Sequence, residues 1–133
     1  MDVFKASLSS DEKKVFLLLK SVVFYYHGLD EEEMVMLEET AARIKGEEEM
    51  EWALSFVSKD YLNSFERARE YLKPLMKTLE KEKVVAFLWD VWKANDKKGY
   101  TTEMEASAMI RLARDWGIDY EIRDLIRKEY RYF

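Results

Sequence analysis

The chain of 133 residues contains no cysteine. Disulfide bonds, thiolate zinc sites, iron–sulfur clusters and cysteine nucleophiles are therefore excluded. There is a single histidine, His27, whereas a di-iron bundle with two Glu-x-x-His motifs needs two and histidine-based zinc hydrolases need more than one. The serines have no base other than His27 and no sequence context for a triad, and a glycine-rich phosphate loop is missing. These absences predict a protein that is not an enzyme.

Residues that interrupt helices are also scarce, with one proline, Pro74, and four glycines. Few breakers favour helices joined by short turns, and no useful length of sequence alternates between apolar and polar residues as a strand would. No apolar run approaches the roughly 20 residues that span a membrane. The first residues lack the pattern of a secretory signal. We therefore expect an all-α, cytoplasmic protein without a membrane-spanning segment.

Acidic residues outnumber basic ones, and the formal net charge is −5. The excess lies in residues 1–70, which hold 16 Asp and Glu against 9 Lys and Arg, whereas residues 71–133 hold 11 against 13. The most acidic stretch, 30–51, is opposed only by Arg43 and Lys45. Because nucleic-acid binding needs a cationic surface that displaces counterions, we expect no nucleic-acid partner.

An internal repeat organises the chain. The glycines form two pairs, Gly28–Gly46 and Gly99–Gly117, each separated by 18 positions. Val15, Phe16, Leu18, Leu19, Val22 and Val23 correspond at an offset of 69 to Val84, Val85, Phe87, Leu88, Val91 and Trp92, and Glu33, Leu37 and Ala41 correspond at an offset of 72 to Glu105, Met109 and Ala113. The matches predict a duplicated helix–loop–helix. We expect one domain, 1–133, whose segments 12–46 and 83–117 are related by a pseudo-twofold axis.

Helix start and stop signals agree with this layout. Reciprocal capping boxes are predicted for Ser9–Glu12, Asp30–Glu33, Asn63–Glu66 and Thr102–Glu105. Gly46 and Gly117 are expected to be left-handed residues that end the helices before them. The pattern predicts about seven helices, near 10–26, 30–45, 48–58, 63–79, 82–95, 102–115 and 119–131. The first and fifth are expected at the centre of the bundle, and Pro74 is expected to kink or divide the fourth.

The two loops of the repeat carry a resemblance to a known family. The second copy, KANDKKGYTTEME, places Ala94, Asp96, Gly99, Thr102 and Glu105 in the order small residue, Asp, Gly, cap and Glu, and the first copy, YYHGLDEEE, has His27 in place of the Asp, followed by Gly28, Leu29, Asp30 and Glu33. This pattern resembles the TerB-like family of tellurite-resistance proteins, related to the N-terminal domain of the co-chaperone DjlA. The resemblance covers about residue 12 to the C-terminus. It implies an all-helical, pseudo-twofold fold and a role in metal or stress response.

The same resemblance implies that acidic residues at these loops bind divalent cations. Hard cations prefer several oxygen ligands that converge from a loop. The candidate ligands are Asp96, Glu103 and Glu105 in the second loop and, after them, Asp30 and Glu33 in the first, for a loosely bound Ca²⁺, Mg²⁺ or Mn²⁺. Both loops depart from the family pattern, one by His27 and the other by Lys97 and Lys98. The alternative needs no metal, because acids at helix starts act as caps and complement the macrodipole.

Three functions remain open. The first is a non-enzymatic TerB-like interaction or stress-response module with optional divalent-cation sensing. The second is a metal-independent helical scaffold or complex subunit whose acidic face docks a basic partner. The third, for which the sequence offers the least support, is an enzyme with an unfamiliar carboxylate site. Each of the first two implies a protein partner or self-association. Aromatic residues make up 14% of the chain, and since aromatics are enriched in interface cores, a homodimer through an aromatic-containing helix face is a further hypothesis.

Overall fold

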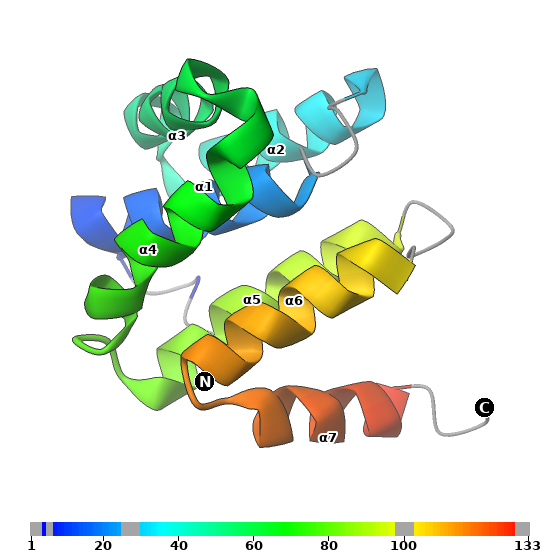
Figure 1. Cartoon of the computed structure of the whole chain (residues 1–133). Coiled ribbons are helices and arrows are strands. Elements are labelled where there is room, and N and C mark those ends of the chain that lie inside the picture. The colour runs from blue at the N-terminus through cyan, green and yellow to red at the C-terminus, as the bar shows by residue number, and fades with distance from the viewer. Residues whose placement is uncertain (1–3, 5–6, 25–29, 98–102, 130–133) are drawn as a thin grey trace. The chain divides into compact units, whose positions relative to one another are not determined.

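The computed structural model describes residues 4, 7–24, 30–97 and 103–129. These residues form seven α-helices and one 3₁₀ turn, with no strand among them (Figure 1). The elements are α1 Ser10–Phe24, α2 Glu31–Ile44, α3 Glu47–Lys59, η2 Tyr61–Asn63, α4 Ser64–Met76, α5 Lys81–Asp96, α6 Glu103–Asp115 and α7 Asp119–Glu129. The predicted all-α bundle of about seven helices is confirmed.

The helix bounds differ from the predicted ones by a few residues. α4 shows the largest difference, because it ends at Met76 rather than near residue 79. Pro74 lies inside its last turn, so the proline does not divide the helix. No helix in the described part of the chain has both the length and the apolar composition needed to cross a lipid bilayer.

The chain folds into two compact units, Met1–Leu72 and Lys73–Phe133, with the boundary inside α4. In the first unit α1 packs against α2 and α3, which also pack against each other (Figure 1). In the second unit α5, α6 and α7 contact one another pairwise. Each unit is therefore built around a set of three mutually packed helices.

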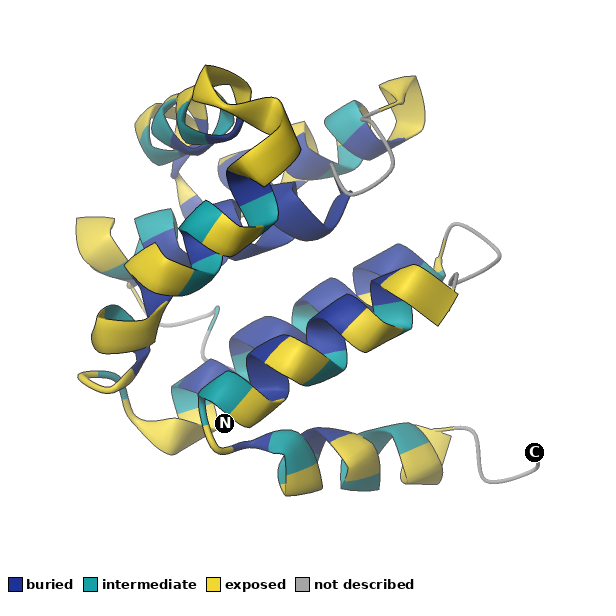
Figure 2. Ribbon diagram, in the orientation of Figure 1, coloured by how far each residue is buried: buried dark blue, intermediate teal, exposed yellow. Residues whose placement is uncertain are grey.

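The central helix of the first unit, α1, is buried at every position from Val15 to Phe24 (Figure 2). Phe16, Leu17, Leu18 and Leu19 have no measurable exposure. Burying one such side chain contributes about 1.5–3 kcal/mol relative to leaving it in water. In the second unit α5 has more buried residues than α6 or α7, and they include Phe87, Leu88 and Val91.

A lysine lies inside the buried segment of α1. Lys20 is only 3% exposed, and its Nζ donates a hydrogen bond to Thr40 Oγ1 at 2.9 Å. The Thr40 hydroxyl in turn donates to the Met36 carbonyl at 2.8 Å. The rings of Phe16 and Phe24 lie 5.5 and 6.0 Å from the ammonium. An unpaired ammonium would be costly to bury, and these contacts offset that cost while they fix α2 against α1.

Two of the predicted capping boxes are confirmed. Ser9 accepts from the Glu12 amide at 3.1 Å, and the Glu12 carboxylate accepts from the Ser9 amide at 2.8 Å. Asp30 and Glu33 form the same reciprocal pair at the start of α2. In the third predicted box, Asn63–Glu66, the side chains have other partners: Asn63 donates to Asp60, and Glu66 forms an ion pair with Arg69. The fourth box depends on Thr102, which lies outside the described residues, as do Gly28 and Gly99.

The prediction that Gly46 is left-handed is wrong. Lys45, one residue earlier, has φ 57° and ψ 48°, while Gly46 has φ −118° and begins α3. The Gly46 amide donates to the Ala41 carbonyl at 2.8 Å, which closes a Schellman turn. Gly46 is glycine for a different reason: a methyl group there would lie 3.1 Å from Leu17 Cδ1 and 3.3 Å from Ile44 Cγ1. The position needs a small residue because it packs directly against α1.

The turn between α6 and α7 has the same geometry. Gly117 has the predicted left-handed conformation, with φ 70°, and the Ile118 amide donates to the Ala113 carbonyl at 2.9 Å. The next helix begins two residues after the left-handed residue in both units, at Glu47 and at Asp119. This is a local correspondence. The duplication of segments 12–46 and 83–117 and their pseudo-twofold relation stay predictions.

The two turns predict opposite effects of substitution. Lys45→Gly should raise the free energy of unfolding by about 0.5–1 kcal/mol, because glycine adopts positive φ without the strain that a Cβ introduces. Gly117→Ala should lower it by about 1 kcal/mol through backbone strain alone, since no atom lies within 4 Å of the added methyl group. Urea unfolding followed by circular dichroism measures both. A clear loss of stability in Lys45→Gly would contradict the left-handed assignment.

Candidate functional site

The candidate ligands of the second loop lie at two helix ends. Asp96 is the last residue of α5 and Glu103 the first of α6, and the segment 98–102 between them is outside the described residues. Glu103 is exposed, whereas Glu105, in the third position of α6, is only 2% exposed. Within the described ranges no group of three or more His, Asp or Glu side chains is placed to hold a metal ion. The described structure therefore does not place the carboxylates of Asp96, Glu103 and Glu105 together as a three-ligand site.

The candidate ligands of the first loop serve as a helix cap. Asp30 Oδ1 accepts from the Glu33 amide at 2.8 Å, and Glu33 Oε1 accepts from the Asp30 amide at 3.3 Å. Glu33 is 4% exposed and holds the same third position in α2 that Glu105 holds in α6. The expected equivalence of the two glutamates therefore holds for helix position and burial. The geometry at Asp30 and Glu33 is that of the metal-free alternative.

One buried polar residue beside the second loop was not singled out by sequence reasoning. Asn95 has no measurable exposure, and in the described part of the chain neither polar atom of its side chain has a hydrogen-bond partner. Asn95 continues the buried stripe of Leu88 and Val91 along α5. An asparagine at the spacing of a core position is the signal that could have identified it.

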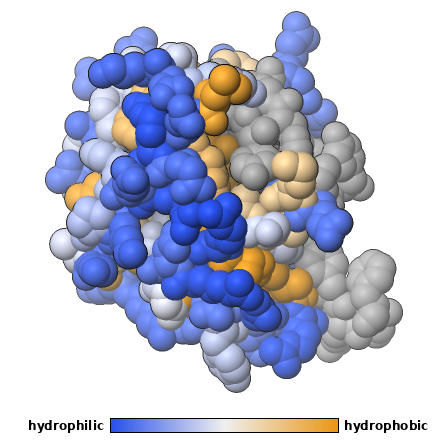
Figure 3. Space-filling model, viewed as in Figure 1, coloured by the Kyte–Doolittle hydropathy of each residue, from blue (hydrophilic) through white to orange (hydrophobic). Residues whose placement is uncertain are grey.

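Exposed carboxylates are concentrated on α2 and α3. The inward stripes of these helices are apolar, with Leu37, Ala41 and Ile44 on α2 and Met50, Ala53 and Val57 on α3. Many of the remaining positions are exposed, and these carry most of the acids. The exposed ones, which we call the α2–α3 acidic surface, are Asp30, Glu31, Glu32, Glu38, Glu39, Glu47, Glu48 and Glu51. The face of the molecule in Figure 3 is likewise mostly hydrophilic, with small areas of hydrophobic residues.

Glu49 connects α3 to the start of α1. The Ser10 hydroxyl donates to the Glu49 carboxylate at 2.7 Å. This hydrogen bond is the main reason that the pKa of Glu49 is lowered, and the positive charges of Lys13 and Lys14 lower it further. Glu49 is therefore ionised at neutral pH. Its contact with Ser10 holds the first turn of α3, where Glu47 and Glu48 lie, against α1.

Three aromatic residues form a separate group between α3 and α4. The ring centroids of Trp52, Phe56 and Tyr71 lie 5.5 to 5.7 Å apart. Arg67 covers Phe56, with its guanidinium carbon 4.4 Å from the ring centroid, and donates to the Phe56 carbonyl at 2.9 Å. Trp52 and Phe56 are half-buried and Tyr71 is 38% exposed. The group thus joins two helices and also presents aromatic surface to solvent.

Comparison with known proteins identifies no relative: no family, curated protein or solved structure matches the chain. The TerB-like resemblance therefore continues to depend on the loop residues alone. The tellurite and stress-response roles that it implies stay hypotheses.

The cation hypothesis makes a direct prediction. If Asp96, Glu103 and Glu105 bind Ca²⁺, Mg²⁺ or Mn²⁺, the site should be weak, with a dissociation constant of about 10⁻⁴ M or higher, comparable to low-affinity calcium modules. Titrating each ion while following backbone amide shifts should then move the signals of residues 94–105. Glu103→Gln should abolish the response and Glu82→Gln, an exposed control on α5, should not. Unchanged shifts at several millimolar ion would leave the carboxylates with a capping role only.

Proposed function

We propose that the chain is a non-enzymatic interaction module whose α2–α3 acidic surface docks a basic segment of a partner protein. The observation that carries the proposal is the exposure of eight carboxylates, seven on the mutually packed helices α2 and α3 and one, Asp30, at the N-cap of α2. Residues 30–51 contain only two basic residues, Arg43 and Lys45. The negative potential of this surface is therefore only partly neutralised within the segment itself.

The contacts that hold α2 and α3 against α1 favour docking of a partner without rearrangement of these helices. α2 is held to α1 by the buried Lys20–Thr40 hydrogen bond, and α3 is held to α1 by the Ser10–Glu49 hydrogen bond. A charged surface on fixed helices attracts an oppositely charged partner over about one Debye length, roughly 8 Å at physiological salt. Such a surface increases the association rate and orients the partner, while buried contacts supply most of the affinity.

The broader role follows from the TerB-like resemblance rather than from this geometry. On that basis we propose that the module acts in a stress response and binds a divalent cation weakly. Docking through the acidic surface requires no cation, so the two proposals can fail separately. The cytoplasm remains our proposed location.

Self-association is the competing use of the exposed side chains. Tyr71 belongs to the group with Trp52 and Phe56, and Leu62 in η2 is 91% exposed. A homodimer through this part of α3 and α4 would bury aromatic surface. It would depend little on salt, whereas docking of a basic segment would weaken as salt rises.

The acidic surface predicts salt-dependent binding of a lysine-rich peptide. A fluorescently labelled peptide of alternating lysine and serine should bind at low salt, and its affinity should fall steadily as sodium chloride is added. The triple variant Glu38→Gln, Glu39→Gln, Glu51→Gln should bind about tenfold more weakly, because each exposed ion pair contributes a few tenths of a kcal/mol to about 1 kcal/mol.

The matched control is Glu70→Gln, Glu82→Gln, Glu129→Gln, which changes the net charge equally at exposed positions outside the acidic surface. Fluorescence anisotropy measures the peptide affinity, and light scattering measures the mass of the free protein. Equal weakening by both triple variants would show that net charge alone attracts the peptide, and the proposed surface would then be wrong. A dimer whose contacts cover α3 would also contradict it.

A further inference from the structure

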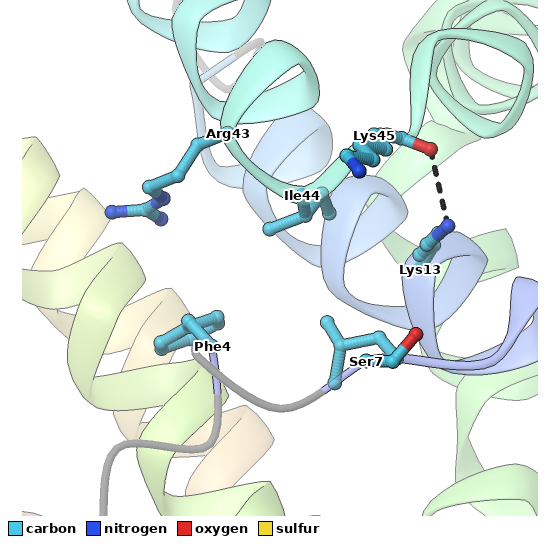
Figure 4. Close-up of a pocket in the computed structure, with 7 residues that line it drawn as sticks. Phe4, Ser7, Lys13, Arg43, Ile44 and Lys45 are labelled. Atoms are coloured by element: carbon cyan, nitrogen blue, oxygen red, sulfur yellow. Dashed lines mark hydrogen bonds between the residues drawn. The ribbon is translucent and has the colours of Figure 1, made fainter.

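A pocket of about 240 Å³ lies in the first unit where the start of α1 meets the end of α2. The side chains around it are shown in Figure 4. Its described lining consists of Phe4, Ser7, Leu8, Lys13, Arg43, Ile44 and Lys45. Arg43 and Phe4 lie on one side of the space and Lys13, Lys45 and Ser7 on the other, with Ile44 between them (Figure 4).

The charge of this lining differs from that of its surroundings. The first unit contains 16 acidic and 9 basic residues, but the described lining contains three basic residues and no acidic one. Since Lys13 comes from α1 and Arg43 and Lys45 come from the end of α2, the three residues line one pocket only in the folded chain. The described lining is therefore positive although the unit is negatively charged, and the charge of Lys13 also acts on the Glu49 carboxylate.

Contacts within the pocket orient two of the cations. Lys13 Nζ donates to the Lys45 carbonyl at 3.1 Å, and an ammonium has two further protons to donate. The guanidinium carbon of Arg43 lies 5.2 Å from the ring centroid of Phe4, within the range of a cation–π contact that holds the guanidinium beside this ring. Lys45 has an exposed side chain on a backbone fixed by the Schellman turn.

Helix stabilisation explains only part of this arrangement. Basic residues near a helix C-terminus complement the macrodipole, which accounts for Arg43 and Lys45 at the end of α2. It does not account for a cavity between them or for its wall of Phe4, Leu8 and Ile44. Lys13 also stabilises this helix end, because its ammonium donates to the Lys45 carbonyl at the C-cap of α2, so the cavity and its apolar wall are the features that capping leaves unexplained.

We infer that this pocket binds the phosphate group of a small organic phosphate monoester. A phosphate monoester is close to dianionic at neutral pH and has three acceptor oxygens, which suits three cations and the Ser7 hydroxyl. The apolar wall would contact the organic part. The volume is below the roughly 300–1,000 Å³ of pockets for drug-sized ligands, so the ligand is small. The site is independent of the α2–α3 acidic surface, which attracts cations.

Phenyl phosphate is a suitable probe, with inorganic phosphate and phenol as partial ligands. At constant pH and ionic strength, phenyl phosphate should shift the backbone amide signals of Leu8, Ile44 and Lys45 in a saturable manner, with a dissociation constant of about 1 mM or lower. Inorganic phosphate should bind more weakly at the same amides because it lacks the apolar part, and phenol should bind more weakly still. The absence of saturable shifts with phenyl phosphate would overturn the inference.

Lys45→Gln is the sharpest variant, because it removes one cation and keeps the carbonyl that accepts from Lys13. It should weaken phenyl phosphate binding about tenfold, as expected for loss of one charge-assisted hydrogen bond. Lys59→Gln, an exposed control at the end of α3, should leave the affinity unchanged. Equal weakening in both variants would overturn the site. Tighter binding of a phosphoserine peptide than of phenyl phosphate would overturn the small-molecule assignment.

Discussion

The first unit depends on the burial of α1 along its whole central segment. From Val15 to Phe24 each residue is removed from solvent, including Lys20. A single neighbouring helix cannot cover every side of such a helix, and α2 and α3 both pack against it. The ammonium of Lys20 adds a polar constraint, because it must keep its hydrogen bond to Thr40 for the segment to remain buried. The position of α2 is therefore fixed both by apolar contacts and by polar ones, among them the Lys20–Thr40 hydrogen bond.

The surfaces of the unit follow from this packing. Because Leu37, Ala41 and Ile44 are buried, the acidic residues of α2 other than Glu33 face solvent, and most acidic residues of α3 lie on the side away from the buried Ala53 and Val57. The turn at Lys45 and Gly46 sets the entry of α3, since Gly46 lies against Leu17 of the core helix. The same turn places Lys45 beside Lys13. The α2–α3 acidic surface and the pocket lined by Lys13, Arg43 and Lys45 thus both belong to one packed unit.

The helices could be predicted from the sequence because their signals are local. The capping boxes at Ser9 and Asp30 and the scarcity of breakers determine where helices begin and end, and those features depend on a few adjacent residues. Gly117 was correctly predicted to be left-handed, whereas in the turn after α2 the prediction chose Gly46 instead of Lys45, because glycine is the usual left-handed residue. Tertiary packing against Leu17 decided the outcome. The basic pocket could not be predicted from short stretches of sequence either, because Lys13 and Arg43 line one pocket only when α1 and α2 pack. The resemblance indicated carboxylate ligands at two loops. At the first of them, the structure shows that Asp30 and Glu33 form the capping box of α2.

Native-state hydrogen exchange tests the central role of α1 most directly. Under native conditions the amides of Leu17 to Val23 should exchange only through global unfolding, so that their opening free energy equals the free energy of unfolding measured with urea. The first turns of α2 and α3 should open at lower cost, because their outer faces are solvated. If the amides of Leu17 to Val23 instead exchanged through a local opening of lower free energy than those of α2 and α3, α1 would not be the element that holds the unit together.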